Sequence, residues 1–231
     1  MPLEALVFDV DGTLAETEEI HRQAFNETFA AFWLGWHWSV GDYRVLLRTT
    51  GGKERIRTHA ETLGAALDDA FVRRLHAAKT ERYGELIADG AVALRPGIGA
   101  LIEEASAHGL RLAVATTTNR PNVDALIRAA CGCEADEMFE VIAAGDEVAA
   151  KKPAPDVYEL ALRRLNLSAA RCVAFEDSAN GLKSARGAGL QTVVSPSQYT
   201  SGEDFAGALM IVDDYRALSI RDVTDALLAT A

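Results

Sequence analysis

The sequence predicts an α/β fold in which a parallel sheet core, flanked by helices, carries an inserted all-helical domain. Short apolar runs rich in strand-forming residues recur along the second half of the chain, and helical patterns separate them. Such alternation is typical of a parallel sheet covered by helices. Between the first and second apolar runs the pattern is helical throughout, which indicates an insertion. The 231 residues suffice for one domain with such an insert.

The first expected strand covers residues 3–10, an apolar run that ends in an acidic cluster containing glycine. Residues 17–86 are rich in Ala, Glu, Arg and Leu at a spacing typical of amphipathic helices, with interruptions that contain glycine. We therefore expect an α/β core formed by residues 1–15 and 91–231, and a helical domain formed by residues 16–90.

The second half supplies the remaining elements of a Rossmann-like core. Pro96 and Gly97 precede a helix that we expect to end near His108. Further strands and helices then alternate to the end of the chain. The expected strands cover residues 110–118, 139–144, 172–176, 191–194 and 210–212, and the expected helices begin near Val123, cover residues 153–165 and 178–188, and begin near Tyr215.

Composition limits the classes of partner. Lys plus Arg number 23 and Asp plus Glu number 34, and the resulting net charge of −11 argues against nucleic acid. No apolar run approaches the roughly 18 residues that a membrane helix needs. Three cysteines without paired spacing are typical of reduced thiols, and the first residues lack the basic region and apolar core of a secretion signal, so we expect none. We therefore expect a cytoplasmic monomer without nucleic-acid or membrane partners, or an organelle-stroma protein if a transit peptide has been removed.

Chemically active residue types follow four of the expected strands. In an open α/β sheet, ligands bind where the strands end. A single strand that ends in acidic residues is often only a solvated loop, but four such ends on one sheet indicate a site. The residues are the carboxylates Asp9 and Asp11, the hydroxyls of Thr116, Thr117 and Thr118, the ammonium of Lys152, and the carboxylates Glu176 and Asp177.

Together these residue types indicate phosphoryl transfer. Clustered carboxylates repel one another unless a hard cation binds them, and Mg²⁺ prefers oxygen ligands. One carboxylate can attack phosphorus and form an aspartyl phosphate, while a second carboxyl group moves the proton of the leaving group. A lysine and hydroxyls can hold the phosphate oxygens. The sequence does not have the spacing of an EF-hand loop, a P-loop or a serine nucleophile elbow.

The chain carries four strings that resemble the motifs of the haloacid dehalogenase-like superfamily: DVDGTL at 9–14, VATTT at 114–118, KKP at 151–153 and FEDSANG at 175–181. The resemblance spans nearly the whole chain. It implies a Mg²⁺ cofactor, with Asp9 as nucleophile and metal ligand. It implies that Asp11 is the general acid/base and gives the metal a backbone carbonyl. The remaining implied contacts are to phosphate from Thr116, Thr117 and Lys152, and to metal from Glu176 and Asp177.

The insert is similar to the all-helical cap domain of the β-phosphoglucomutase-like branch, and we call residues 16–90 the cap. Four strings resemble CbbY-type sugar-phosphate phosphatases, which are linked to carbon fixation and act on xylulose 1,5-bisphosphate: AETEEIHRQAFNETFA, TTGGKERI, HAAKTER and VATTTNRPNV. This resemblance implies a small phosphorylated sugar as substrate. It implies substrate contacts from Glu18, Tyr43, Gly51, Gly52, Lys53, Glu54, Lys79, Arg82, Thr118, Asn119 and Asn122. We also expect a substrate contact from His21, which shares a helix face with Glu18.

Three other functions stay open at this point. Thr17 and His21 match the pattern of β-phosphoglucomutase, although the turn TGGKE replaces the Val-Ser-Arg string of that enzyme. Phosphoglycolate phosphatase belongs to the same branch. A non-catalytic regulator or chaperone-like binder on this fold would require a damaged motif, and all four motifs are intact.

Two further features of the cap carry expectations. His76, Lys79 and Arg82 recur every three residues on a predicted helix and form a basic stripe. With the glycine-containing turn at 51–53, this stripe suits a second phosphate. The tryptophans Trp33, Trp36 and Trp38, together with His37, are expected to fill the core of the cap.

Overall fold

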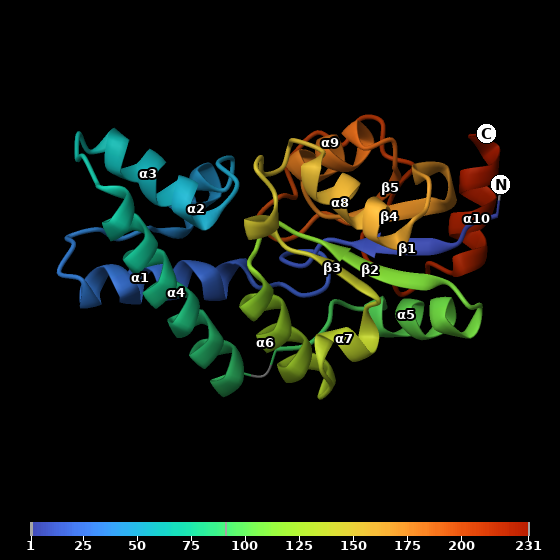
Figure 1. The fold of residues 1–231 in the computed structure, drawn as a ribbon, viewed down its shortest axis with the longest axis horizontal. Coiled ribbons are helices and arrows are strands. Elements are labelled where there is room, and N and C mark those ends of the chain that lie inside the picture. The colour runs from blue at the N-terminus through green and yellow to red at the C-terminus, as the bar shows by residue number, and fades with distance from the viewer. Residues whose placement is uncertain (1, 91, 231) are drawn as a thin grey trace.

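A computed structural model describes residues 2–90 and 92–230, whose path is shown in Figure 1. The core is a six-stranded sheet with the order β3-β2-β1-β4-β5-β6, and every neighbouring pair is parallel. The predicted α/β class with a parallel sheet is confirmed. The strands are β1 (Ala5–Phe8), β2 (Arg111–Ala115), β3 (Val141–Ala143), β4 (Cys172–Glu176), β5 (Gln191–Val194) and β6 (Met210–Ile211).

The core helices follow in the predicted order, with two differences. The short helix α7 is not predicted from the sequence. The last helix begins at Ile220 rather than near Tyr215, because Ser219 accepts a hydrogen bond from the N–H of Asp222 and caps it, while Tyr215 is buried. The helices are α5 (Ile98–Ala107), α6 (Arg120–Cys131), α7 (Ala135–Met138), α8 (Asp156–Leu165), α9 (Ala179–Gly187) and α10 (Ile220–Ala229).

Helices cover both faces of the sheet because both faces are apolar. Along β1, Leu6 and Phe8 belong to the apolar core that includes α5, α6 and α10, whereas Ala5 and Val7 pack on the side of α8 and α9. Figure 1 shows α8 and α9 on one side of the sheet and α5, α6 and α7 on the other. Strands buried on both faces have near-continuous apolar sequences, which is why the apolar runs predict their positions.

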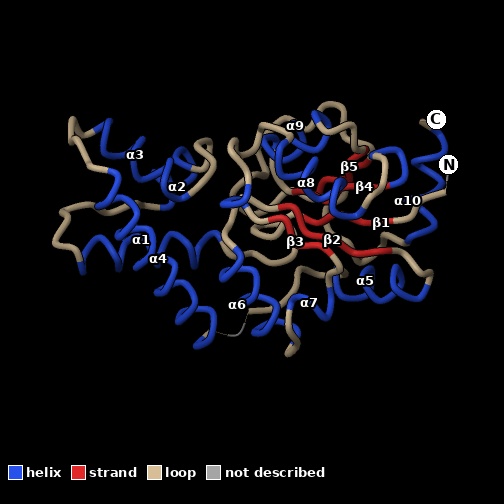
Figure 2. The backbone as a smooth tube through the Cα atoms, in the orientation of Figure 1, coloured by secondary structure: helices blue, strands red, loops and turns tan. Residues whose placement is uncertain are grey.

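Of the helices described between β1 and β2, the first four form a bundle beside the sheet, as Figures 1 and 2 show, and α5 belongs to the core. The helices of the bundle are α1 (Glu18–Ala31), α2 (Val40–Leu46), α3 (Gly52–Thr62) and α4 (Asp69–Asp89). The bundle has its own apolar core around Phe25, Phe29, Tyr43 and Leu75. The predicted helical insertion is confirmed, while the expected boundary at residue 91 lies outside the described residues.

The tryptophans of the cap differ in their environments. Trp38 is fully buried among aromatic side chains of α1 and α2, and Trp36 packs against the same cluster. The prediction is wrong for Trp33, which is 94% exposed. Helix α1 ends at Ala31, and Trp33 adopts a left-handed φ of 56°, so its side chain leaves the helix face that enters the core. His37 is exposed as well.

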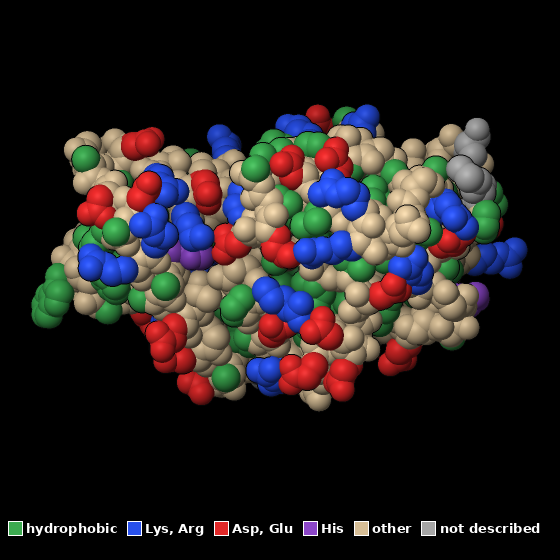
Figure 3. Space-filling model, in the orientation of Figure 1, with side chains coloured by type: hydrophobic (Ala, Val, Ile, Leu, Met, Phe, Trp, Pro, Cys, Tyr) green, Lys and Arg blue, Asp and Glu red, His purple; other side chains and the backbone are tan. Residues whose placement is uncertain are grey.

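Charged residues are distributed over the surface and along the helices. Helix α4, the longest of those described, carries charges along its length, and none of the helices within residues 2–90 and 92–230 is sufficiently long and apolar to cross a membrane. On the face shown in Figure 3, Lys and Arg side chains lie among Asp and Glu side chains. This face therefore presents mixed charge.

Candidate active site

A cavity lies between the carboxyl ends of the strands and the cap. Loops of the core and the helices α1, α3 and α4 of the cap contribute to its wall. It lies where ligands bind in open α/β sheets. The lining residues that the sequence predicts are Asp9, Asp11, Glu18, His21, Gly51, Gly52, Lys53, Glu54, Lys79, Thr116, Thr117, Thr118, Asn119, Asn122, Lys152 and Asp177.

Asp9 follows β1 directly and is buried at the base of the cavity. Its N–H donates to the carbonyl of Phe175 at 3.0 Å, which holds it beside β4. The Nζ of Lys152 donates to Oδ1 of Asp9 and to Oε1 of Glu176, at 2.6 Å in each case. Burial raises the pKa of Asp9 to about 7, Lys152 opposes the rise, and Glu176 adds to it. Burial by itself would lower the pKa of Lys152, but the two carboxylates raise it, so the lysine stays cationic.

Three buried carboxylates, Asp9, Glu176 and Asp177, form a group in which one oxygen of each lies within 4.8 Å of the others. Burial raises the pKa of Asp177 well above its usual value, and the other two carboxylates raise it further. Two glycines leave the space that this group needs: a Cβ on Gly12 would collide with the Asp177 carboxylate, and one on Gly181 would collide with that of Glu176. A hard cation relieves such repulsion, so the group fits Mg²⁺.

Glu176 lies behind the other two carboxylates and is fully buried. Its Oε1 accepts hydrogen bonds from Lys152 and from the hydroxyl of Tyr158, both at 2.6 Å. Asp9 and Asp177 line the cavity, whereas Glu176 is not among the lining residues. Glu176 therefore adds negative charge to the group and positions Lys152 beside Asp9.

Asp11 turns toward the cap. Its Oδ1 accepts hydrogen bonds from Oγ1 of Thr17 at 2.6 Å and from Nε2 of His21 at 3.0 Å. The Nδ1 of His21 faces Nζ of Lys79 at 2.5 Å, so Nδ1 is the acceptor and Nε2 carries the proton that Asp11 accepts. Burial raises the pKa of Asp11, but His21 and Thr17 outweigh it and lower the pKa to about 2. In this arrangement Asp11 is an ionised proton acceptor two residues from Asp9.

The loop after β2 and the start of α6 present hydroxyl and amide groups to the cavity. Oγ1 of Thr116 accepts from the N–H of Thr118 at 3.2 Å. Asn119 caps α6 by accepting from the N–H of Asn122 at 3.1 Å, and its Nδ2 donates to Thr80 of α4 at 3.2 Å. The N-terminus of a helix favours anions because its first N–H groups lack partners within the helix. This segment therefore suits phosphate oxygens.

In the cap wall, Glu18, Tyr43 and Arg55 form a hydrogen-bonded chain. The hydroxyl of Tyr43 donates to Oε2 of Glu18 and accepts from Nη1 of Arg55, at 2.8 Å in each case. Glu18 and Arg55 line the cavity, and Tyr43 lies behind them. Arg55 was not predicted as a lining residue, because a single arginine in a polar helix carries no sequence signal of its burial.

Lys53, at the start of α3, spans from the cap to the core. Its Nζ lies 3.2 Å from Oδ1 of Asp146, and the Nζ of Lys151 lies 3.4 Å from the same oxygen. Burial raises the pKa of Asp146, but the two lysines outweigh it and lower the pKa. All three residues line the cavity. Asp146 was not predicted as a site residue, although it lies only three residues after β3.

Arg82 is not brought to the cavity. It lies on α4 one turn beyond Lys79 and pairs with Glu27 and Glu85 instead. His76 does line the cavity with Lys79, so the predicted basic stripe is divided between the cavity and the outer surface of the cap. Burial lowers the pKa of His76 to about 3, and Lys79 adds to the effect, so His76 is a neutral group.

The fold and the site together define a class of enzyme. The haloacid dehalogenase-like hydrolase family matches residues 3–189, which is most of the chain. The chain belongs to the haloacid dehalogenase-like hydrolases. The superfamily membership and enzymatic nature that its four motifs predict are confirmed.

The chain is similar along nearly its whole length to CbbY proteins. It is 60% identical over 225 residues to the protein CbbY of Rhodobacter capsulatus, which covers 97% of this chain and 99% of that one. A crystal structure of CbbY from Rhodobacter sphaeroides in complex with phosphate matches with a TM-score of 0.93 and 55% identity, over 96% of this chain and 99% of that chain. The predicted resemblance to CbbY-type proteins is confirmed.

Two further structures bear on the site and the fold. An aspartate-to-asparagine mutant of CbbY from Rhodobacter sphaeroides, in complex with xylulose 1,5-bisphosphate, matches with a TM-score of 0.91 and 56% identity, over 94% of this chain and 96% of that chain. A β-phosphoglucomutase from Clostridium difficile matches with a TM-score of 0.84 over 99% of this chain and 98% of that chain, at 18% identity. The second match demonstrates a shared fold alone.

Proposed function

We propose that the protein is a Mg²⁺-dependent phosphatase that hydrolyses xylulose 1,5-bisphosphate through an aspartyl phosphate on Asp9. The observation that carries the proposal is a cavity with two separate groups of cations. Lys152 is paired with Asp9, whereas Lys53 and Lys151 are paired with Asp146. A sugar with two phosphates matches these two groups. The relative that is 56% identical binds such a sugar, xylulose 1,5-bisphosphate.

In the first step, an oxygen of Asp9 forms a bond to phosphorus, and the bond between phosphorus and the sugar oxygen breaks. The leaving alkoxide takes a proton from the carboxyl group of Asp11. Asp11 can donate only when it is protonated, and its contacts with Thr17 and His21 favour the ionised form. We therefore expect these contacts to weaken when substrate is bound.

In the second step, water attacks phosphorus, and the bond between phosphorus and the Asp9 oxygen breaks. Asp11, now ionised, takes a proton from the attacking water. The hydrogen bonds from Thr17 and His21 favour this ionised form of Asp11. Inorganic phosphate leaves, and the free Asp9 carboxylate is restored.

Positive charge and hydrogen-bond donors stabilise the reacting phosphate. Lys152 offsets the repulsion between the Asp9 carboxylate and the incoming anion, and Thr116 offers a hydroxyl close by. When bound, Mg²⁺ supplies further positive charge against the phosphate oxygens. The residues that would hold it are the carboxylates of Asp9, Glu176 and Asp177, together with the backbone carbonyl of Asp11 that the family resemblance implies.

We also propose that residues 16–90 act as a cap on a core formed by residues 1–15 and 91–231. A phosphate bound by Lys53 of the cap and Lys151 of the core would join the two parts. Cap closure driven in this way would exclude bulk water from the reacting phosphate. We also propose, as the sequence leads us to expect, that the protein is a monomer in the cytoplasm, or in an organelle stroma if a transit peptide has been removed.

A second candidate is β-phosphoglucomutase, which the hydrogen bonds of Asp11 to Thr17 and His21 favour because these residues match the mutase pattern. A mutase passes the phosphoryl group from the aspartate to a sugar hydroxyl, whereas a phosphatase passes it to water. The turn at 51–54, where the mutase pattern has Val-Ser-Arg, supports the phosphatase.

The test is to incubate the purified protein with xylulose 1,5-bisphosphate and Mg²⁺ and to follow the products by ³¹P NMR. We expect one equivalent of inorganic phosphate and one of a xylulose monophosphate, and no turnover in excess EDTA. Isomerisation of β-glucose 1-phosphate faster than any bisphosphate is hydrolysed would establish the mutase instead. Full activity in EDTA would contradict the metal requirement.

A further inference from the structure

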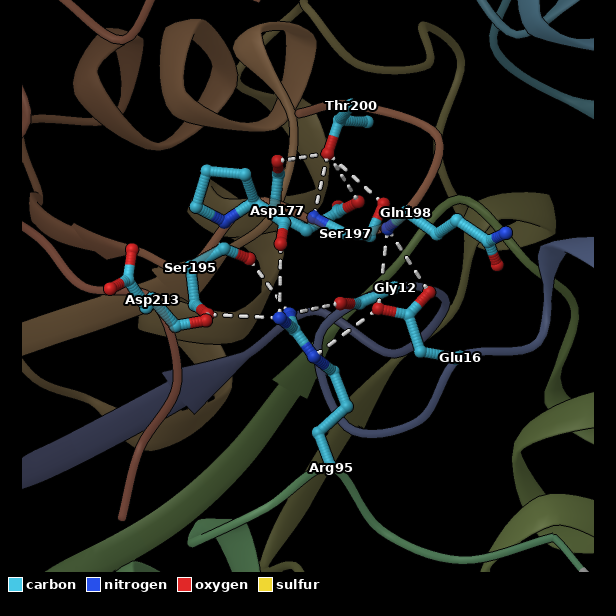
Figure 4. A network of polar contacts seen from close by, with 10 residues as sticks. Gly12, Glu16, Arg95, Asp177, Ser195, Ser197, Gln198, Thr200 and Asp213 are labelled. Atoms are coloured by element: carbon cyan, nitrogen blue, oxygen red, sulfur yellow. Dashed lines mark hydrogen bonds and ion pairs between the residues drawn. The ribbon is translucent and has the colours of Figure 1, made fainter. Parts of the chain in front are cut away.

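Arg95 lies in the segment that leads from α4 of the cap into α5 of the core, and only 7% of its surface is exposed. It does not line the cavity. Figure 4 shows its guanidinium between two loops. Nη1 donates to the carbonyls of Gly12 at 2.6 Å and Ser195 at 2.7 Å, and Nη2 donates to Oγ of Ser195 at 2.9 Å and the carbonyl of Pro196 at 3.0 Å.

The first of these loops carries the proposed nucleophile and acid/base. Gly12 directly follows Asp11, and the backbone N–H of Arg95 also donates to the carbonyl of Leu14 at 2.7 Å. Arg95 therefore holds the loop on both sides of Thr13. Its Nε lies 3.5 Å from Oε1 of Glu16, where the chain enters the cap.

The second loop, after β5, supports the acidic end of β4. The N–H of Ser195 donates to the carbonyl of Glu176 at 2.9 Å. Further along, Oγ1 of Thr200 donates to the carbonyl of Asp177 at 2.7 Å and accepts from the N–H of Ser197 at 2.8 Å. Figure 4 shows Ser195 on one side of the guanidinium and Gly12 on the other, with Ser197 and Thr200 above it.

Gly12 lies where these two loops meet the end of β4: a Cβ there would collide with the carboxylate of Asp177, which follows β4, and would lie 3.2 Å from Cβ of Ser197 in the loop after β5. A guanidinium offers five donors in a rigid plane, and a displacement of either loop would leave some of these buried donors without acceptors. The single ammonium of a lysine cannot reach four acceptors on two loops. The hydrogen bonds of the Arg95 side chain therefore fix the distance between the two loops.

We infer that Arg95 is a positioning residue, which holds the loop after β1 against the loop after β5 and thereby sets the placement of Asp9 relative to Asp177. These two carboxylates face the cavity and belong to the group that fits a divalent cation. The inference rests on the proposed function for its effect on turnover. Its effect on cation binding does not require turnover.

The test uses the full chain with Arg95→Met and Arg95→Lys, and Mn²⁺ as a spectroscopic probe of the cation site. We expect Arg95→Met to raise the Kd for Mn²⁺, measured by electron paramagnetic resonance, about tenfold. With Mg²⁺ and 4-nitrophenyl phosphate we expect kcat to fall about 30-fold while KM stays within about threefold. Arg95→Lys should give smaller changes of the same kind.

Arg111 provides the matched control. It donates to the carbonyl of Leu165 at 2.7 Å and pairs with Glu140, at the opposite end of the sheet from the cavity. We expect Arg111→Met to leave the Mn²⁺ affinity and kcat unchanged, whatever stability it loses in urea unfolding.

Wild-type Mn²⁺ affinity and kcat in folded Arg95→Met would overturn the inference and make Arg95 a purely structural residue. If Arg95→Met does not fold, the same two measurements on Arg95→Lys decide, and wild-type values there overturn it. If the wild-type protein binds Mn²⁺ but hydrolyses no phosphate ester, the proposed function fails, and the Mn²⁺ affinities still decide the role of Arg95.

Discussion

The Nζ of Lys152 lies 2.6 Å from Oδ1 of Asp9, and both side chains are buried. The same Nζ also donates to Oε1 of Glu176 at 2.6 Å. Among the described contacts, none joins this Nζ to Asp177, the third carboxylate of the group. One cation therefore faces three carboxylates. This imbalance is the physical reason to expect a metal ion at the site.

Asp9→Asn removes the proposed nucleophile with little change in shape. An amide attacks phosphorus poorly and does not bind Mg²⁺ as a charged ligand. We expect kcat for 4-nitrophenyl phosphate, measured with saturating Mg²⁺, to fall by at least about a thousandfold, or about 4 kcal/mol of barrier. Activity above about a tenth of wild type would contradict the assignment.

Lys152→Met leaves Asp9 and Glu176 buried without their cation. Removing one partner of a buried ion pair costs about 3–5 kcal/mol. We expect a loss of that order in the free energy of unfolding by urea in EDTA, and a smaller loss when Mg²⁺ supplies replacement charge. The neighbouring Lys151→Met, which disrupts a half-exposed ion pair, should cost about 1 kcal/mol or less. Equal losses for Lys152→Met with and without Mg²⁺ would count against a cation at this site.

Asp11→Asn should separate the two chemical steps. A nitrophenolate leaves without a proton, whereas a sugar alkoxide needs one. In stopped-flow measurements on 4-nitrophenyl phosphate we expect a burst of about one equivalent of nitrophenolate followed by slow turnover, because the base for the second step is lost. Turnover of a sugar bisphosphate should fall at least about 100-fold without a burst of released sugar. A burst of equal size with the sugar substrate would argue against Asp11 as the acid.

Burial lowers the pKa of Lys79 to about 7, so its cationic fraction in the free protein decreases as pH rises through that value. If the cation assists binding of an anionic substrate, kcat/KM should fall above about pH 7, by up to tenfold per pH unit. Lys79→Met should lower kcat/KM and remove this limb of the profile. Arg82→Met, one turn further on the same helix, should leave the profile intact because Arg82 lies outside the cavity. A limb that persists in Lys79→Met would belong to another group.

The core site was predictable because its signals are local in the sequence. Asp9 and Asp177 each follow an apolar strand, and a parallel sheet places the ends of its strands at one edge. The outer wall was less predictable. Three residues rotate a helix by about 300°, so positions three apart drift by about 60° at each step, and Arg82 turns away from the face that His76 and Lys79 share. Arg55 lies in the cavity wall because of tertiary packing against Tyr43, and a short sequence motif does not predict such packing.

The exposed Trp33 marks another limit of the sequence. A tryptophan near the end of an amphipathic pattern predicts a core position, but the helix ends two residues earlier, at Ala31. The left-handed backbone at Trp33 then directs the side chain outward. Helix ends are set by local capping and by tertiary contacts. The sequence around residues 31–33 has no capping glycine that would predict where this helix ends.

The central claim is that the cavity recognises two phosphates, and the most direct test is the ratio of kcat/KM for xylulose 1,5-bisphosphate to that for either xylulose monophosphate in Mg²⁺. We expect a ratio of at least about 100, or about 2.7 kcal/mol of transition-state binding. Lys53→Met should reduce the ratio below about 10 while sparing 4-nitrophenyl phosphate. A ratio near one in the wild-type protein, or no hydrolysis of the bisphosphate, would contradict the account.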